Sequence, residues 1–460
     1  MAEPARGRWQ RWALVLCVLW VGGCATYTDK LSKVRVATER GDYDAGVLAL
    51  DKLLDVEGPE QLPDKWTAHK PLVALERAML FQAQGRYEWS ARDLSAAEEE
   101  LEFLDLTQDP VGTIGKYVYS DTAGVYKVPP TERLALNGLN MLNYLAMNDL
   151  QGAGVEARRF TIARDYIESL AKNNSKTSHG AFGSYVAGFV FEKLGEPDRA
   201  LRYYEETLGP ANLASLREPI LRLSAQGRYR GPKLKAFLRE LGQPASDEKS
   251  TPPANEEPDG EILVVLGLGR VPYKIPERMP IGAAIGYAGV SVTGNPEVLA
   301  HTVFKFVVYP ELVTPDSQVN GAAVRLDGQS LGTELLTDLG AEIAREYETI
   351  KPKIIAAALT RMIARAAAAE GARYVGRKKE GKTTGFLAAL FTEAALTALD
   401  RPDTRSWTLL PGRIYVCRTR VKPGQHEIQV QLSGRAPQTR TVQVDVPPGG
   451  YGIAAITEPR

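Results

Sequence analysis

A cysteine near the N-terminus has the clearest potential for chemistry in this sequence. Cys24 follows the Val-Gly-Gly sequence of residues 21–23 at the end of an apolar run, and three arginines precede that run. The run over residues 12–21 has the length of a signal-peptide hydrophobic region, about half of the ~20 residues that a transmembrane helix needs. An apolar residue, two small residues and a cysteine are typical of a bacterial lipobox, in which the thiol becomes a thioether to diacylglycerol. We therefore predict a signal peptide over residues 1–23 and lipidation of Cys24.

The residue after this cysteine bears on the destination of the protein. It is Ala25, whereas an aspartate there would favour retention in the inner membrane of a Gram-negative cell. We therefore predict a lipid anchor in the outer membrane, a tether over residues 24–30 and a chain that faces the periplasm. Buried acyl chains such as palmitate contribute about 0.8 kcal/mol per methylene, so multiple acylation holds a protein at the membrane. The alternative is a chance cysteine after an uncleaved signal anchor.

Two glycine-containing motifs resemble nucleotide-binding sequences in residue type but lack the flanking elements that such sites need. Residues 376–383 match the P-loop pattern G-x-x-x-x-G-K-[ST], but a P-loop follows a buried strand and here an alanine-rich helical segment precedes the motif. We predict a solvated turn between two helices instead. The pair Gly267 and Gly269 follows an apolar strand, but the third glycine of a dinucleotide fingerprint is missing and Pro272 opposes the helix that should follow. We expect no cofactor.

Residues with metal-binding or catalytic potential are scattered along the chain. The four histidines, His69, His179, His301 and His426, are far apart and none has a second ligand at metal-site spacing. Once the leader and Cys24 are set aside, Cys417 is the remaining thiol, and its apolar surroundings in the sequence predict a buried, unreactive side chain. We therefore expect no metal and no enzyme. A hydrolase with an unrecognised pair of acidic residues is the alternative.

Composition limits the classes of partner. The chain has 460 residues, with 56 lysines and arginines against 56 acidic residues. A neutral balance argues against nucleic acid as a partner, and this length predicts two or three domains. The apolar segment over residues 386–399 contains Glu393 and is short for a membrane span, so we expect it to pack against the alanine-rich helix before it.

The N-terminal half has the periodicity of helices over residues 31–243, and one design recurs in it four times. A turn residue is followed five positions later by a small residue and, four positions after that, by a residue that fills the next turn. This is the pattern of the second helix of a tetratricopeptide repeat. The turn residues are Gly41, Gly85, Asn148 and Gly195, and the small residues are Gly46, Ser90, Ala153 and Ala200. The uneven spacing predicts a degenerate array with insertions, and a generic helical bundle is the alternative.

The C-terminal half begins after a polar, proline-rich stretch over residues 244–260, which we predict to be a disordered linker. Strands are expected near residues 261–269, 286–292 and 301–310, followed by a helix over 334–372 with a break at Pro352. Alternating apolar residues and turn signals after residue 412 then predict four strands. The fold class expected for residues 261–460 is α+β, an antiparallel β-sandwich with a helical insertion near 334–400.

Three segments resemble an uncharacterised family of bacterial outer-membrane lipoproteins with tetratricopeptide-like repeats and a C-terminal α+β domain. The first runs over residues 124–160 and contains Tyr126, Glu132, Asn143 and the stretch 155–159. The others are residues 264–282 and 403–428. The long insertion before Tyr126 departs from the family pattern. The resemblance implies an accessory envelope protein and supports the architecture more than any activity.

These observations favour a scaffold that binds an envelope protein or peptide in the groove of its helical repeats. Three tyrosines on or beside the insertion are candidate anchors, because aromatic residues provide contact area at a low cost in entropy. The full set of partner-binding candidates is Tyr117, Tyr119, Tyr126, Glu132, Asn143, Arg158 and Trp407. For Glu132, Arg158 and Trp407 we favour structural roles: Glu132 at a helix start capped by Thr131, Arg158 paired with Glu132 or Glu156, and Trp407 between the last helix and the sandwich.

The alternative function is a cell-wall accessory protein that binds peptidoglycan or another polysaccharide through the C-terminal sandwich. Trp66 and Trp407 would then be the residues that stack on sugar rings.

Overall fold

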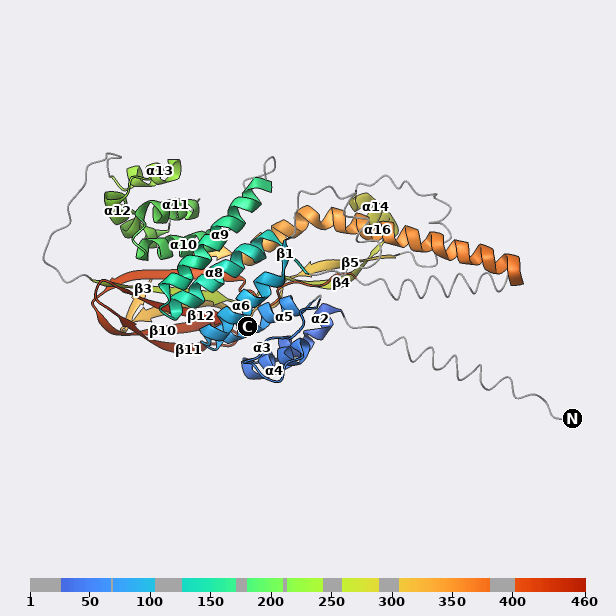
Figure 1. Ribbon diagram of the computed structural model, residues 1–460, viewed down its shortest axis with the longest axis horizontal. Coiled ribbons are helices and arrows are strands. Elements are labelled where there is room, and N and C mark those ends of the chain that lie inside the picture. The colour runs from blue at the N-terminus through green and yellow to red at the C-terminus, as the bar shows by residue number, and fades with distance from the viewer. Residues whose placement is uncertain are drawn as a thin grey trace.

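The computed structural model describes residues 26–67, 69–103, 126–170, 180–209, 213–242, 259–288, 306–380 and 402–460. It is a mixed α/β structure with helices in the N-terminal half and sheets in the C-terminal part, which confirms the predicted order of helices before strands (Figure 1). Cys24, Tyr117, Tyr119, most of the predicted linker and the apolar segment 386–399 lie outside the described residues. Among those described, no helix is long and apolar enough to cross a bilayer.

The helical half consists mainly of helix pairs. Its elements are α2 (Tyr27–Lys30), α3 (Ser32–Glu39), α4 (Tyr43–Leu54), α5 (Lys70–Ala83), α6 (Tyr87–Glu100), α8 (Pro130–Ala146), α9 (Leu150–Leu170), α10 (Ala181–Lys193), α11 (Pro197–Thr207), the 3-10 turn η1 (Ala214–Leu216), α12 (Arg217–Gln226) and α13 (Pro232–Glu240). Two short strands, β1 (Glu102–Phe103) and β2 (Lys127–Val128), pair in parallel before α8.

The four turn residues of the sequence pattern join these pairs. Gly41, Gly85, Asn148 and Gly195 all have positive φ, between 58° and 76°, a backbone conformation that glycine adopts at no steric cost and asparagine tolerates. Each turn reverses the chain, so α3 packs on α4, α5 on α6, α8 on α9, and α10 on α11. The small residue of each copy is buried, as the close approach of two helices requires.

The C-terminal part contains two four-stranded sheets. The inner sheet has the order β12-β3-β9-β8 and the outer sheet the order β11-β10-β6-β7. The strands are β3 (Gly260–Leu268), β6 (Val319–Leu326), β7 (Gln329–Leu331), β8 (Glu334–Asp338), β9 (Arg413–Val421), β10 (Gly424–Gly434), β11 (Gln438–Val446) and β12 (Tyr451–Glu458). A separate two-stranded antiparallel sheet, β4 (Tyr273–Pro280) with β5 (Phe306–Val313), packs with α14 (Ile281–Ala288) and α16 (Leu339–Glu380).

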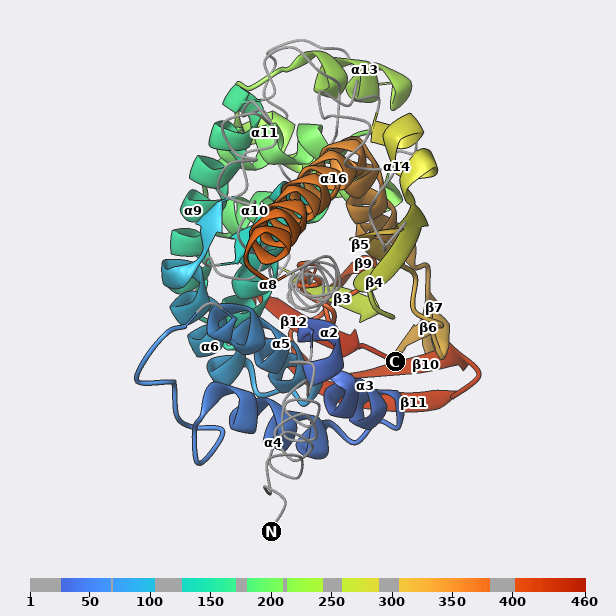
Figure 2. The same cartoon turned by 90° about the vertical axis from the view of Figure 1, so that its right-hand side faces the viewer.

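The inner sheet is buried on both faces. In β3, Ile262, Val264 and Leu266 face the outer sheet, whereas Leu263 and Val265 belong to the hydrophobic cluster of the helices. Helices α5 and α8 lie directly against β12. Helices, inner sheet and outer sheet therefore form three layers, as Figure 2 shows. The predicted boundary separates helices from strands along the chain, but the two halves share one continuous core.

Several local expectations about the C-terminal half are wrong. β12 runs parallel to β3, because the chain passes from the outer sheet to the free edge of the inner one. Residues 286–288, expected in a strand, end α14, whose Ile281, Ala284 and Ile285 have helical spacing.

Residues 334–338, expected in a helix, form strand β8 against β9. Helix α16 continues through Pro352. It also includes residues 376–380 of the P-loop-like motif, where a turn was expected.

The predicted tether is shorter than the sequence suggested. Residues 27–30 form α2, which begins with a capping box made by Thr26 and Asp29. Tyr27 and Thr28 are buried, and the Thr28 hydroxyl donates a hydrogen bond to the Lys274 carbonyl at 2.6 Å. The folded body therefore begins within three residues of Cys24.

Candidate functional site

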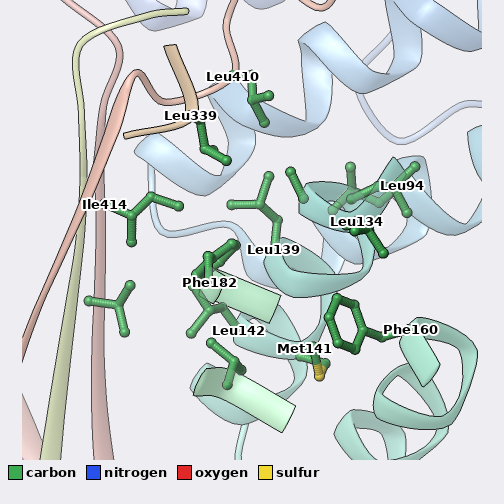
Figure 3. Packing of buried hydrophobic residues seen from close by; sticks show 14 of the residues in the cluster. Leu94, Leu134, Leu139, Met141, Leu142, Phe160, Phe182, Leu339, Leu410 and Ile414 are labelled. Carbon is green, nitrogen blue, oxygen red and sulfur yellow. The ribbon is translucent and has the colours of Figure 1, made fainter. Parts of the chain in front are cut away.

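The most unusual feature of the described chain is an extended segment enclosed between helices and sheet. We call residues 403–411 the inserted segment. It forms no regular helix or strand, yet its residues from Thr404 to Leu410 are at most 5% exposed. Figure 3 shows Leu410 beside Leu339, in the cluster that also holds Ile414 and, from α8, Leu139 and Leu142. Such a segment carries backbone groups that need buried partners.

Two glutamates on the helices supply these partners. The Glu76 carboxylate accepts hydrogen bonds from the backbone N–H of Thr408 and of Leu409, each at 2.7 Å. Glu132 accepts the backbone N–H of Trp407 at 3.4 Å and the Tyr126 hydroxyl at 2.7 Å. The Trp407 indole N–H donates to the Leu75 carbonyl at 3.1 Å. Helices α5 and α8 thus bind the inserted segment through its backbone.

The first end of the inserted segment is attached to α2 and to the region before α8. The backbone N–H of Thr28 donates to the Thr404 hydroxyl at 3.3 Å. The Arg405 guanidinium forms an ion pair with Asp403 at 2.6 Å and lies over the Tyr126 ring, 5.9 Å from its centre. The segment therefore joins α2, α5 and α8, which are far apart in the sequence.

Four buried glutamates of α5, α8 and α16 have raised pKa values. Burial raises the pKa of Glu76 to about 8, although the two backbone N–H groups oppose the shift. Burial also raises the pKa of Glu132, that of Glu346 to about 8 and that of Glu342 to about 7. One oxygen each of Glu342 and Glu346 has no hydrogen-bond partner among the described residues. Each of the four side chains is at most 8% exposed, so the chain itself covers them.

The structure brings three of the predicted candidates together, but not at a surface. Tyr126, Glu132 and Trp407 are 3% exposed or less, so the expectation that Tyr126 anchors an external partner is wrong. Trp407 is fully buried and cannot stack on a sugar. It contacts α5, whereas a contact between the last helix and the sandwich was expected. Trp66 is half-buried against the core.

Asn143 belongs to a neighbouring network. Its side chain donates to Ser90 at 2.9 Å and accepts from Gln82 at 2.8 Å, and Gln82 accepts the Thr457 hydroxyl at 2.7 Å. Asn143 is fully buried, so it connects α8, α6, α5 and β12 and is not a free partner-binding residue.

The helix cap and the ion pair that the sequence predicted for α8 and α9 also differ from those in the structure. Pro129 is the N-cap of α8, so Thr131 lies inside the helix. Arg159, not Arg158, pairs with Glu156, at 3.1 Å. Arg158 itself is exposed on α9, so among the candidates in the described part of the chain it is the one that stays at the surface.

Two buried charged residues of α5 that connect the helices to one another and to the inserted segment were not predicted from the sequence. Glu76 and Arg77 lie in α5, where every residue is buried. Glu76 binds the inserted segment, whereas Arg77 binds Asp51 at 2.7 Å and Asp93 at 2.6 Å on the flanking helices. An adjacent pair of charges inside an otherwise apolar helix is the signal that could have identified them, because charges are rarely buried unless they are paired.

A second missed group joins α10 to the inner sheet. Arg418 on β9 is buried and forms ion pairs with Glu192 at 2.6 Å and with Glu261 at 2.5 Å. Burial alone would raise the pKa of Glu192, but Arg418 and Lys193 outweigh it and hold that pKa well below its usual range.

The remaining predicted groups have ordinary surroundings. Cys417 is buried between the sheets, and burial raises the pKa of its thiol to about 12. His426 pairs with Asp327 at 2.7 Å. His179 and His301 lie outside the described residues. Within the described part of the chain, no group of three or more His, Cys, Asp and Glu residues could hold a metal ion.

Comparisons with known proteins give little help. No protein-family model matches the chain, and no curated protein matches it either. The crystal structure of MamA protein is similar over 47% of this chain and 82% of its own, with 13% sequence identity and a TM-score of 0.25. Similarity at this level supports no conclusion about fold or function.

The buried carboxyl groups make the stability of the fold depend on pH. Glutamates ionise near pH 4.5 in the unfolded chain, whereas Glu346 holds its proton to about pH 8 in the folded one. Its contribution to folding is complete below pH 4.5 and is lost as the pH rises to 8. In the unsubstituted protein, ionisation of Glu346 should lower the free energy of unfolding by on the order of 2–4 kcal/mol between pH 5 and 8. We expect this decrease to be absent from the Glu346→Gln variant.

Chemical denaturation at several pH values measures this difference. The matched control is Glu348→Gln, because Glu348 lies on the same helix with its side chain 58% exposed. Equal pH dependence of the Glu346→Gln variant and the unsubstituted protein would contradict the assignment.

Proposed function

We propose that this protein is a non-enzymatic scaffold, anchored by lipid at Cys24 in the outer membrane and facing the periplasm. It binds other envelope proteins through its helical half, which we interpret as a degenerate tetratricopeptide-like array. The C-terminal sheets form a β-sandwich that supports this array. The proposal includes membership of the lipoprotein family that the sequence resembles.

The occupied inner face of the helices is the observation that carries this proposal. Helical-repeat proteins bind partners on extended helical surfaces, and here the face toward the inner sheet already holds a polypeptide segment by its backbone amides. That segment belongs to the chain itself. A partner must therefore bind the outer face, where Val36, Leu48, Val155, Ile162 and Tyr166 are 43–72% exposed.

The short connection to Cys24 bears on how the scaffold sits at the membrane. The helix α2 begins at Tyr27, and an extended residue spans at most about 3.6 Å. The body would then lie within about 10 Å of the lipid-linked cysteine. This distance restricts the orientation of the protein and keeps its outer helices close to proteins at the same membrane.

A photo-crosslinking residue in place of Arg158 tests the partner face in intact cells. We expect protein adducts at this position, because the side chain is exposed beside apolar residues of the outer face. Gln431 is the control position, since it is exposed on the outer sheet. The absence of protein adducts at Arg158, or an identical pattern at both positions, would count against the proposed function.

Mass spectrometry of the native protein tests the anchor separately. We expect the N-terminal peptide to begin at Cys24 with a diacylglycerol on its sulfur, and the Cys417 peptide from the same digest to carry no lipid. A leader still attached to an unmodified Cys24 would refute the anchor without bearing on the partner face.

A further inference from the structure

Helix α9 carries a continuous exposed stripe on its outer side. Val155, Ile162 and Tyr166 are 43%, 72% and 49% exposed, and their spacing of seven and four residues places them on one helix face. The same face carries exposed charged residues. Arg158 and Arg159 precede Ile162 in the sequence, and Asp165 follows it. Both views of the molecule place α9 at the outside of the helical layer (Figures 1 and 2).

The opposite face of α9 accounts for its packing within the chain. Ala153, Ala157 and Phe160 are fully buried against the neighbouring helices α8 and α10. The exposed stripe is therefore additional to what the fold needs. Isolated exposed apolar residues are ordinary, but three in register on one helix are typical of an interaction surface.

The charges of the stripe are separated along its length. Arg158 and Arg159 lie toward the start of the helix, whereas Asp165 and Glu168 lie toward its end. Arg159 already pairs with Glu98 and Glu156, and the two acidic residues pair with Arg164, but their side chains stay 44–69% exposed. Two copies of the stripe in parallel would place like charges together. Two antiparallel copies would place arginines opposite acidic residues, so the stripe is complementary to itself in one direction only.

We propose that this stripe binds a second copy of the same chain, with the two α9 helices antiparallel about a two-fold axis at Ile162. The proposal rests on the proposed function and names the partner of its outer face. Ile162 meets Ile162 of the second copy, and Arg158 lies opposite Asp165 of the second copy, because Arg158 and Asp165 lie on the same flank of α9. The two-fold axis makes the contact between Arg158 and Asp165 twice and the Ile162 contact once.

The size of the stripe sets the strength of the contact. One pair of helices buries less than the roughly 1,200 Å² of the smaller stable interfaces, so the dimer is weak in dilute solution. Attachment to a membrane raises the effective concentration of one copy around another. The dimer is therefore best sought in the native envelope.

Disulfide crosslinking of Ile162→Cys in intact envelopes tests the proposal. A residue on the two-fold axis meets its own copy, so a mild oxidant should produce a covalent dimer. The matched control is Leu48→Cys, because Leu48 is 55% exposed on another outer helix and should give little dimer. The unsubstituted chain should give none, since Cys417 is buried and Cys24 is acylated in the proposed function.

Charge variants add a second readout in the Ile162→Cys background. Asp165→Arg should lower the dimer yield about fivefold, because it replaces two exposed ion pairs by two like-charge contacts. Arg158→Asp combined with Asp165→Arg should restore the yield. Thermal unfolding of each variant shows whether the fold is retained.

The outcomes separate this inference from the proposed function. Dimer yields for Ile162→Cys no higher than for Leu48→Cys, or unaffected by Asp165→Arg, would overturn the α9 interface. Adducts from Arg158 to other proteins without such a dimer would leave the scaffold function standing. Dimers of the unsubstituted chain would show that Cys24 is free.

Discussion

The binding of the inserted segment by Glu76 is the interaction on which the rest of the structure depends. A carboxyl group at 0% exposure is costly to bury unless its oxygens are hydrogen-bonded, and two backbone amides separated from it by 332 and 333 residues satisfy both oxygens. Those amides in turn have no strand or helix to pair with. The contact thus satisfies both the Glu76 oxygens and the backbone amides of the inserted segment. The helices and the sheets therefore depend on each other for their stability.

This constraint determines which surfaces remain for function. The inner helices α5, α8 and α10 are covered by the inserted segment and the inner sheet, and the ion pairs of Arg418 close the same interface at its other end. The outer helices keep exposed apolar and charged residues. The scaffold we propose therefore presents the outer face of its helices to partners, whereas the inner face stabilises the fold. On α9 the exposed apolar residues lie in a row along one side of the helix.

Local signals made part of this fold predictable. Turn residues such as Gly41 and Gly195 need positive φ, and small residues such as Ala153 need a close helix, so the helix pairs follow from the sequence. The parallel pairing of β12 and the strand at 334–338 depend on distant partners and could not be predicted in this way. The same holds for Trp407 and Glu132: structural roles were expected for both, but their actual partners, on α5 and the inserted segment, are distant in the sequence.

Amide hydrogen exchange at the inserted segment tests the central claim most directly. In the full chain under native conditions, the amides of Thr408 and Leu409 should exchange as slowly as those of the buried strand β3, because their hydrogen bonds to Glu76 break only when the layers separate. Glu76→Ala should accelerate their exchange while β3 stays protected. Rapid exchange of these two amides in the unsubstituted protein, at the rate of exposed loops, would contradict the account.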